Sequence, residues 1–130
     1  GAEPAQTARV VRALSHPAVD VFAHPSGRLI GRRRGADFDF DRVASAAADH
    51  GVMLEVNAQP TRLDLDDVSC RAAITRGVTV TISTDAHSCD ELHQMRWGVD
   101  QARRGWAQKA DVANAIGLKA LLKRLHRARN

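Results

Sequence analysis

Short apolar runs rich in β-branched residues alternate with amphipathic segments along this chain. The run VTVTIST at 78–84 is typical of a buried parallel strand, and similar runs occupy 19–23 and 53–57. These runs follow one another at intervals close to the roughly 30 residues of a strand–helix repeat. Strands joined by helices form a parallel sheet with right-handed connections. The pattern therefore predicts an α/β fold in one domain.

Helices are predicted between and after these strands from their apolar stripes and capping residues. A polar loop over 25–39 leads from the first strand to a helix that Asp39 or Asp41 caps and Gly51 ends. The expected helices cover 4–14, 44–49, 67–76, 90–103 and 118–129, with a turn or short helix at 110–115. The helix over 90–103 is expected to bury one face made of Leu92, Met95, Val99 and Ala102.

Composition places the chain among ordinary globular proteins, with 44% hydrophobic and 26% charged residues in 130. No run approaches the roughly 20 apolar residues of a membrane span, and no secretory signal is seen, so we expect a cytoplasmic protein without a membrane partner. The two cysteines fit no zinc spacing and are expected to be reduced. Cys70 is expected in the core, and Cys89 lies close enough to His87 for a place beside a site there.

The formal net charge is +4, and arginines gather at 28–34, at 103–104 and toward the end of the chain. Guanidinium groups suit bidentate contact with phosphate. A charge this mild is also common on solvated surfaces, so charge alone makes nucleic acid no more than a plausible partner.

Candidate chemistry lies just beyond two of the predicted strands. Asp85 and His87 follow the run at 78–84, and His24 follows the run at 19–23. Residues two apart in an extended segment point the same way, and His with carboxylate is a usual ligand set for zinc, manganese or iron. A lone Asp-x-His is more often a turn or a helix cap. Two strand ends that deliver such ligands to one edge of a sheet favour a metal site instead.

Three further residues are candidates near this edge. Arg28 follows a proline and a glycine that shape the exit from the first strand, and it is placed to meet an anionic oxygen. Asn57 ends the middle strand, where it can orient a ligand, a water or a substrate oxygen. Arg62 lies in the loop after it. Structural pairing and substrate contact remain equally open for Arg62.

Glu55 shares a strand face with Asn57, and a buried glutamate needs a partner. Arg62 and Asp64 are the candidates for that partner, and substrate contact is equally open for both. The other histidines, at 16, 50, 93 and 126, are expected to be exposed. The chain has no GxxxxGK[ST] loop, no GxGxxG after a strand and no GxSxG elbow, which gives no support to nucleotide-triphosphate hydrolysis or serine-esterase chemistry.

Together these residues resemble the polymerase-and-histidinol-phosphatase (PHP) family of metal-dependent phosphoesterases, and most of all the PHP domain that ends bacterial family-X DNA polymerases. The resemblance rests on HPSGRLIG at 24–31, LEVN at 54–57, RLDL at 62–65, TDAHS at 84–88, MRWGV at 95–99 and ARRGW at 102–106. It implies a distorted barrel of seven parallel strands, with up to three divalent metals, zinc or manganese, at the carboxyl ends of the strands. It implies that His24, Asp85 and His87 are metal ligands and that Arg28 and Asn57 neighbour the site.

The family's opening His-x-His motif, its other histidines and its bridging glutamate have no counterpart in this sequence. Residues 1–130 therefore correspond to the C-terminal half of a PHP domain. Three ligands do not hold a three-metal cluster, but they can hold one metal together with water. Such a half-barrel is expected to expose a sheet edge, to pair with a partner that supplies the missing half, or to self-associate.

The resemblance implies a manganese-dependent 3′→5′ exonuclease that acts on a DNA 3′ end and that is joined to a polymerase domain. Two alternatives remain. One is a small-molecule phosphatase of the histidinol-phosphate type, in which the same site meets a phosphorylated small molecule. The other is a binding or structural fragment that the missing ligands make inactive.

Overall fold

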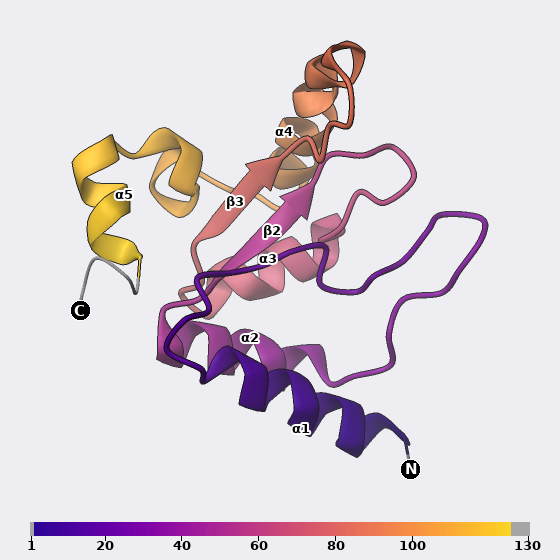
Figure 1. Ribbon diagram of the computed structural model, residues 1–130, viewed down its shortest axis with the longest axis vertical. Helices are drawn as coiled ribbons and strands as arrows, with labels where there is room; N and C mark the ends of the chain where they lie inside the picture. Colours follow the sequence, from indigo (N-terminus) through magenta and orange to yellow (C-terminus); the bar gives the residue numbers. More distant parts are fainter. Residues whose placement is uncertain (1, 126–130) are drawn as a thin grey trace.

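Residues 2–125 are described by a computed structural model, in which three parallel strands lie in the order β1-β2-β3. Figure 1 shows β2 and β3 side by side. The elements are α1 (Ala2–Leu14), β1 (Val21–Phe22), α2 (Phe40–His50), β2 (Met53–Asn57), α3 (Asp67–Thr75), β3 (Val80–Ser83), α4 (Met95–Arg104) and α5 (Leu118–Arg124). Short 3₁₀ helices cover Cys89–Gln94, Lys109–Asp111 and Ala113–Ala115. The α/β prediction with parallel strands is confirmed. Positions 126–129 of the last expected helix, His126 included, lie outside the described residues.

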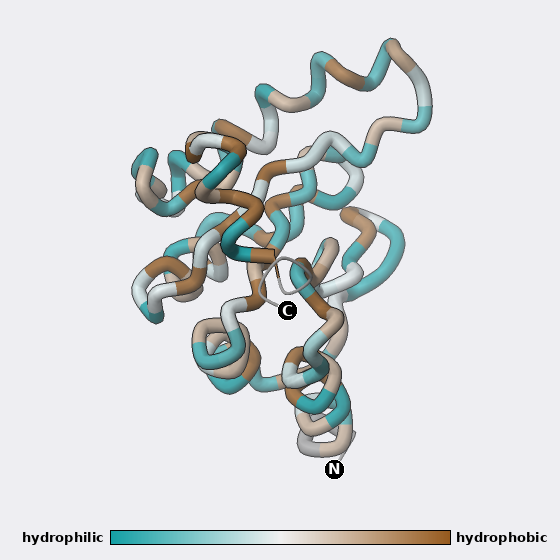
Figure 2. The backbone as a smooth tube through the Cα atoms, turned by 60° about the vertical axis from the view of Figure 1, so that its left-hand side comes forward, coloured by the Kyte–Doolittle hydropathy of each residue, from teal (hydrophilic) through white to brown (hydrophobic). Residues whose placement is uncertain are grey.

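The central strand β2 is buried along its whole length, because elements cover both of its faces. Leu54 and Val56 belong to the apolar core together with Val43 of α2 and Val80 of β3. Side chains alternate along a strand, so Glu55 and Asn57 lie on the face away from these core residues. In Figure 2 the coiled segments of the tube alternate between hydrophobic and hydrophilic residues. The core therefore lies on one face of the sheet and leaves polar residues on the other.

The predicted signals at both ends of α2 are confirmed, and they fix where the helix begins and ends. Asp39 accepts a hydrogen bond from the Arg42 backbone N–H, which satisfies one of the free donors of the first turn. Gly51 ends the helix with a φ of 67°, a conformation that glycine adopts without a Cβ clash. The helix thus returns the chain to β2 at Met53.

The helix predicted over 90–103 is wrong in its first half. A 3₁₀ helix occupies Cys89–Gln94, and α4 begins at Met95. Of the predicted apolar face, Leu92 is 59% exposed and Val99 is 38% exposed, whereas Ala102 is buried and Met95 packs against the core. Gly98, which was not part of the predicted face, is buried as well. The backbone of α4 approaches the sheet closely at Gly98, and an apolar pattern does not register a residue that packs by having no side chain.

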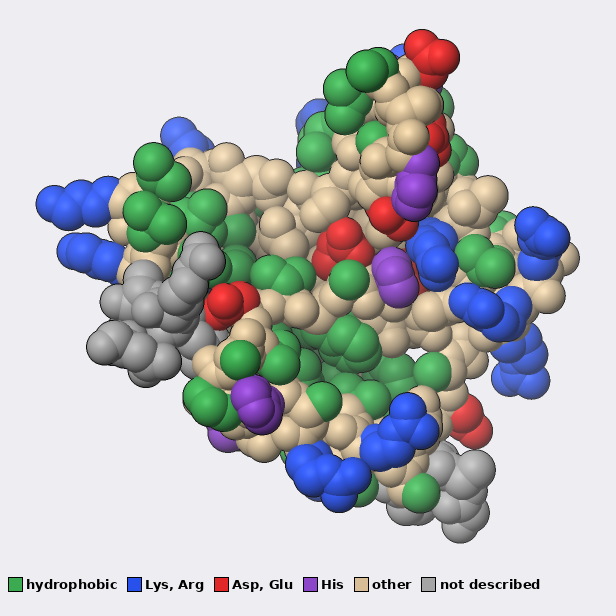
Figure 3. Space-filling model, in the orientation of Figure 1, with side chains coloured by type: hydrophobic (Ala, Val, Ile, Leu, Met, Phe, Trp, Pro, Cys, Tyr) green, Lys and Arg blue, Asp and Glu red, His purple; other side chains and the backbone are tan. Residues whose placement is uncertain are grey.

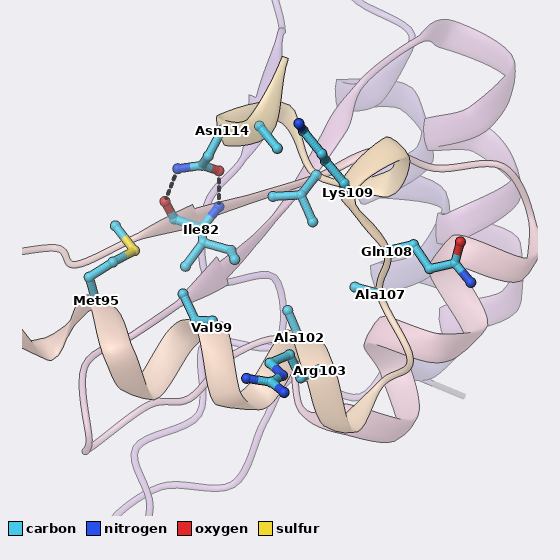
Figure 4. Close-up of a pocket in the computed structure, with 11 residues that line it drawn as sticks. Ile82, Met95, Val99, Ala102, Arg103, Ala107, Gln108, Lys109 and Asn114 are labelled. Atoms are coloured by element: carbon cyan, nitrogen blue, oxygen red, sulfur yellow. Dashed lines mark hydrogen bonds between the residues drawn. The ribbon is translucent and has the colours of Figure 1, made fainter.

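The outer edge of β3 is covered rather than exposed. The Asn114 side chain accepts a hydrogen bond from the Ile82 N–H at 2.8 Å and donates one to the Ile82 carbonyl at 2.8 Å (Figure 4). Val112 adds a parallel bridge to Val80. The expectation of an open sheet edge is thus wrong for β3. On the other side of the sheet, no further strand of the described part pairs with β1.

The cysteines and histidines lie where they were expected. Cys70 is buried and Cys89 is exposed, and both are free thiols. The expected exposure of the histidines at 16, 50 and 93 is confirmed. Among residues 2–125, none of the helices has the length and hydropathy to cross a membrane.

Candidate active site

The first two candidate ligands follow strands directly, and both have a left-handed backbone. The φ angle is 28° at His24 after β1 and 53° at Asp85 after β3. This conformation is uncommon for residues other than glycine and costs on the order of 1–3 kcal/mol, so it is concentrated at functional sites. Because β1 and β3 flank β2 in a parallel sheet, both residues reach the same edge.

The end of β2 joins these two strand ends through Glu55 and Asn57. The His24 backbone N–H donates to Glu55 Oε2 at 2.6 Å. The Asn57 side-chain amide nitrogen lies 3.3 Å from Glu55 Oε2 and 3.1 Å from Asp85 Oδ2. The expectation that Arg62 or Asp64 partners Glu55 is therefore wrong. A fully buried amide instead donates to two carboxylates and reduces their mutual repulsion.

His87 lies two residues beyond Asp85 and is exposed. Its ring nitrogen Nδ1 lies 2.7 Å from the Asp85 carbonyl oxygen. In the tautomer in which Nδ1–H donates to that carbonyl, Nε2 keeps its lone pair. This is how a metal-binding histidine is commonly held, since the second hydrogen bond fixes the ring and its tautomer.

Two residues that the sequence reasoning missed hold the turn between Asp85 and His87. Gln59 Nε2 lies 2.9 Å from the Thr84 carbonyl oxygen, 2.8 Å from the Asp85 carbonyl oxygen and 3.1 Å from Glu91 Oε1, so its two N–H hydrogens are shared among three acceptors. Glu91 Oε2 accepts the His87 backbone N–H at 2.9 Å. The His87 N–H bond, followed by the Gln59 bond, lowers the pKa of Glu91. The available signal was position: Gln59 comes two residues after a strand end.

Of the two roles considered for Asp64, structural pairing and substrate contact, the structure shows the first. Asp64 is only 1% exposed, and its carboxylate accepts from the Ser26 backbone N–H and hydroxyl and from the Gly27 N–H, at 2.9 to 3.2 Å. Its backbone pairs with Asn57 in an antiparallel bridge. The loop that follows His24 is thereby attached to the end of β2.

Arg28 and Arg62 tie the same two loops together. Arg28 donates through Nε to the Arg62 carbonyl at 2.7 Å and through Nη2 to the Leu63 carbonyl at 2.6 Å. Arg62 Nη1 lies 3.4 Å from the Arg28 carbonyl. Arg28 therefore uses two of its five N–H donors on the fold and keeps the others. Its expected contact with substrate, and that of Arg62, stay predictions.

The donor types at this edge suit a divalent metal, because imidazole and carboxylate groups are its usual ligands. Within residues 2–125, however, no group of three or more His, Cys, Asp or Glu side chains lies close enough to hold one ion. The donor types therefore fit a divalent metal, but the described residues do not supply all the ligands for one ion. Figure 3 shows histidine and acidic side chains near one another on one face, with Lys and Arg beside them.

Fold and site together define a class of protein, namely α/β proteins in which histidine, carboxylate and amide groups lie together at one edge of a parallel sheet. Comparison with known proteins narrows this class. The chain is 45% identical over 119 residues to the DNA polymerase/3′-5′ exonuclease PolX of Bacillus subtilis (strain 168). The match covers 89% of this chain and 21% of PolX, so the chain spans about a fifth of that protein's length. No family model matches the chain.

Proposed function

We propose that this chain is part of a metal-dependent phosphoesterase, the 3′–5′ exonuclease module of a family-X DNA polymerase. Its similarity to PolX, a DNA polymerase and 3′-5′ exonuclease by name, supports the DNA substrate. The resemblance to PHP domains supports the chemistry. In this proposal β1, β2 and β3 belong to a larger distorted barrel, and residues 1–130 are the C-terminal half of that domain.

The proposed ligands of a divalent metal, zinc or manganese, are His24, Asp85 and His87, with further ligands supplied from outside the described residues. Such an ion, when bound, lowers the pKa of a bound water and offsets charge on a phosphoryl oxygen. Asn57 orients Asp85, and Arg28 and Arg62 meet the phosphate group of the substrate through the donors that the fold leaves free.

One observation carries the proposal: two strand ends with left-handed backbones, His24 and Asp85, are joined through Glu55 and Asn57 on the strand between them. A buried amide between two carboxylates holds both acids in place beside these two uncommon backbone conformations. Such strain persists where the surrounding structure holds it for a function.

A second candidate is a module that binds DNA without cutting it. It is favoured by the absence, among residues 2–125, of three donors within reach of one ion. Metal binding and strand cleavage therefore need separate measurements. A small-molecule phosphatase is separated from both by its substrate, a phosphomonoester instead of a DNA strand.

The first experiment measures binding of Mn²⁺ to the 130-residue chain by electron paramagnetic resonance. The test variant is His87→Ala, because His87 is exposed and its removal leaves the core intact. The matched control is His16→Ala, which removes an exposed histidine after α1. We expect the parent and His16→Ala to bind Mn²⁺ and His87→Ala to bind it at least about tenfold more weakly, since one of few ligands is lost.

The second experiment follows shortening of a 5′-labelled DNA strand and release of phosphate from a phosphomonoester, each with Mn²⁺. Shortening from the 3′ end that His87→Ala abolishes supports the exonuclease. Phosphate release without shortening supports the small-molecule phosphatase. Mn²⁺ binding with neither reaction supports the non-cutting module. A parent chain that binds no Mn²⁺ overturns the proposed metal site for this chain.

A further inference from the structure

The loop that follows His24 is the most uniformly basic segment of the described chain. Positions 25–36 contain four arginines, at 28, 32, 33 and 34, and no aspartate or glutamate. The loop leaves the sheet beside the candidate site, and Asp64 holds its first residues against the end of β2. Its charge is therefore fixed close to the candidate ligands.

Two of these arginines build the loop. Arg33 donates through Nε and Nη2 to the Gly27 carbonyl, at 3.1 and 2.7 Å, and Arg28 donates to the neighbouring loop at Arg62 and Leu63. The backbone closes on itself where the Leu29 N–H donates to the Arg33 carbonyl at 3.0 Å. A bond from the Ile30 N–H to the Thr61 carbonyl, at 2.7 Å, adds a second attachment. The loop has a defined shape that does not depend on a ligand.

The other two arginines, Arg32 and Arg34, are exposed, and their side chains make no hydrogen bond or ion pair with the described residues. The ion pairs within residues 2–125 lie elsewhere, at Arg76–Asp41 and Arg104–Asp67. Together with their neighbours, Arg32 and Arg34 line a hollow of about 420 Å³. Figure 3 shows Lys and Arg side chains gathered beside the histidine and acidic groups.

A surface of this kind suits a chain of phosphates. Guanidinium groups bind phosphate oxygens with paired hydrogen bonds, and two unpaired arginines side by side match the repeating charge of a nucleic-acid backbone. The loop contains no aromatic residue on which a base would stack, so its contacts do not depend on sequence. An acidic protein surface would offer carboxylates of irregular spacing instead.

We infer that residues 28–35 form a docking surface for the phosphate backbone of a nucleic-acid strand, in which Arg32 and Arg34 make the contacts while Arg28 and Arg33 hold the loop. This inference rests on the proposed function and adds the path of the strand: the backbone lies along the loop that leads to His24. The inference assigns two of the four arginines to phosphate contact and the other two to holding the loop.

The test uses the 130-residue chain and a fluorescent oligothymidylate, with EDTA present so that no metal contributes. Affinity is measured between about 50 and 200 mM NaCl, where the slope of log K against log[salt] counts the neutralised phosphates. The test variant is Arg32→Ala/Arg34→Ala. The matched control is Arg9→Ala/Arg12→Ala, which removes the same charge from exposed positions on α1. Circular dichroism checks that both variants fold.

The test variant is expected to have a slope shallower by about 1.4, because each contact with a single strand contributes about 0.7. The control is expected to keep the parental slope. Equal changes of the slope in both variants would mean that net charge alone acts, which would overturn the inference. An unchanged slope in the test variant would overturn it too, as would a parent chain that does not bind the oligothymidylate. So would oligoglutamate that displaces the oligothymidylate at equal charge concentration, since the surface would then suit an acidic protein. Because EDTA removes metal ions, this experiment tests the docking surface independently of Mn²⁺ binding and strand cleavage.

Discussion

Replacing Gly98 by alanine tests whether α4 lies on the sheet as closely as the structure indicates. A Cβ atom at this position would lie 2.5 Å from Ile82 Cγ2 and 2.9 Å from the Cβ of Ala58. Carbon atoms in contact prefer about 3.5–4.0 Å. The helix would therefore have to move away from the sheet by about 1 Å. Neither neighbour is the far end of a flexible side chain, so neither yields easily.

Two opposing effects set the size of the change. Overpacking of a well-packed core costs about 1–3 kcal/mol. Alanine is a better helix former than glycine by about 1 kcal/mol, which works in the other direction. Because the closest approach is far below a normal contact, we take the upper part of the overpacking range. The expected result is a net loss of about 1–2 kcal/mol in the free energy of unfolding.

Urea unfolding followed by circular dichroism measures this free energy. The matched control is Asp100→Ala, which introduces alanine at an exposed position of the same helix. We expect the control to be as stable as the parent or slightly more stable, since only helix propensity changes. A Gly98→Ala variant that matches or exceeds the parent in stability would refute the close packing of α4 against Ile82 and Ala58.

Three further predictions concern the site and its surroundings. In native protein a thiol reagent should label Cys89 and spare Cys70, because burial raises the pKa of the Cys70 thiol to about 11. Mass spectrometry locates the label, and equal labelling of both cysteines would contradict this placement. Hydrogen bonds lower the pKa of Glu91, so its stabilising effect is present above the ordinary carboxyl value of about 4.3 and is lost as pH falls through the lowered value. Thermal melts should therefore show a larger loss on acidification in the parent than in Glu91→Gln, and parallel losses would argue against it. Gln59→Ala should lower stability by about 2 kcal/mol in urea unfolding and speed amide exchange over 84–91, whereas exchange that stays slow there would remove Gln59 from its holding role.

The sequence predicted best those features that are set by neighbouring residues. The limits of β2, predicted at 53–57, are confirmed to the residue. The cap at the start of α2 was predicted as Asp39 or Asp41 and its end as Gly51, from capping chemistry that acts within one turn, and the structure has Asp39 and Gly51 there. The positions of His24 and Asp85 after strands are of the same kind, because a strand end can be read from where a β-branched run stops.

Features that depend on distant contacts could not be predicted in this way. Glu55 was expected to pair with Arg62 or Asp64, its neighbours along the chain, and it pairs with His24 across the sheet instead. The buried side of α4 was predicted only in part, because Gly98 contributes contact through its missing side chain. In both cases the deciding interaction joins segments that are far apart in the sequence, and no local pattern records it.

The proposed ligands share one property that argues for a site built in advance of its ion. Asp85 has Oδ2 held by Asn57, and its other oxygen, Oδ1, makes no hydrogen bond with the described residues. His87 has Nδ1 held by the Asp85 carbonyl, which leaves Nε2. Each side chain is thus fixed through one atom and keeps a second atom for a ligand. A metal ligand needs this division, because its orientation must be set before the ion arrives.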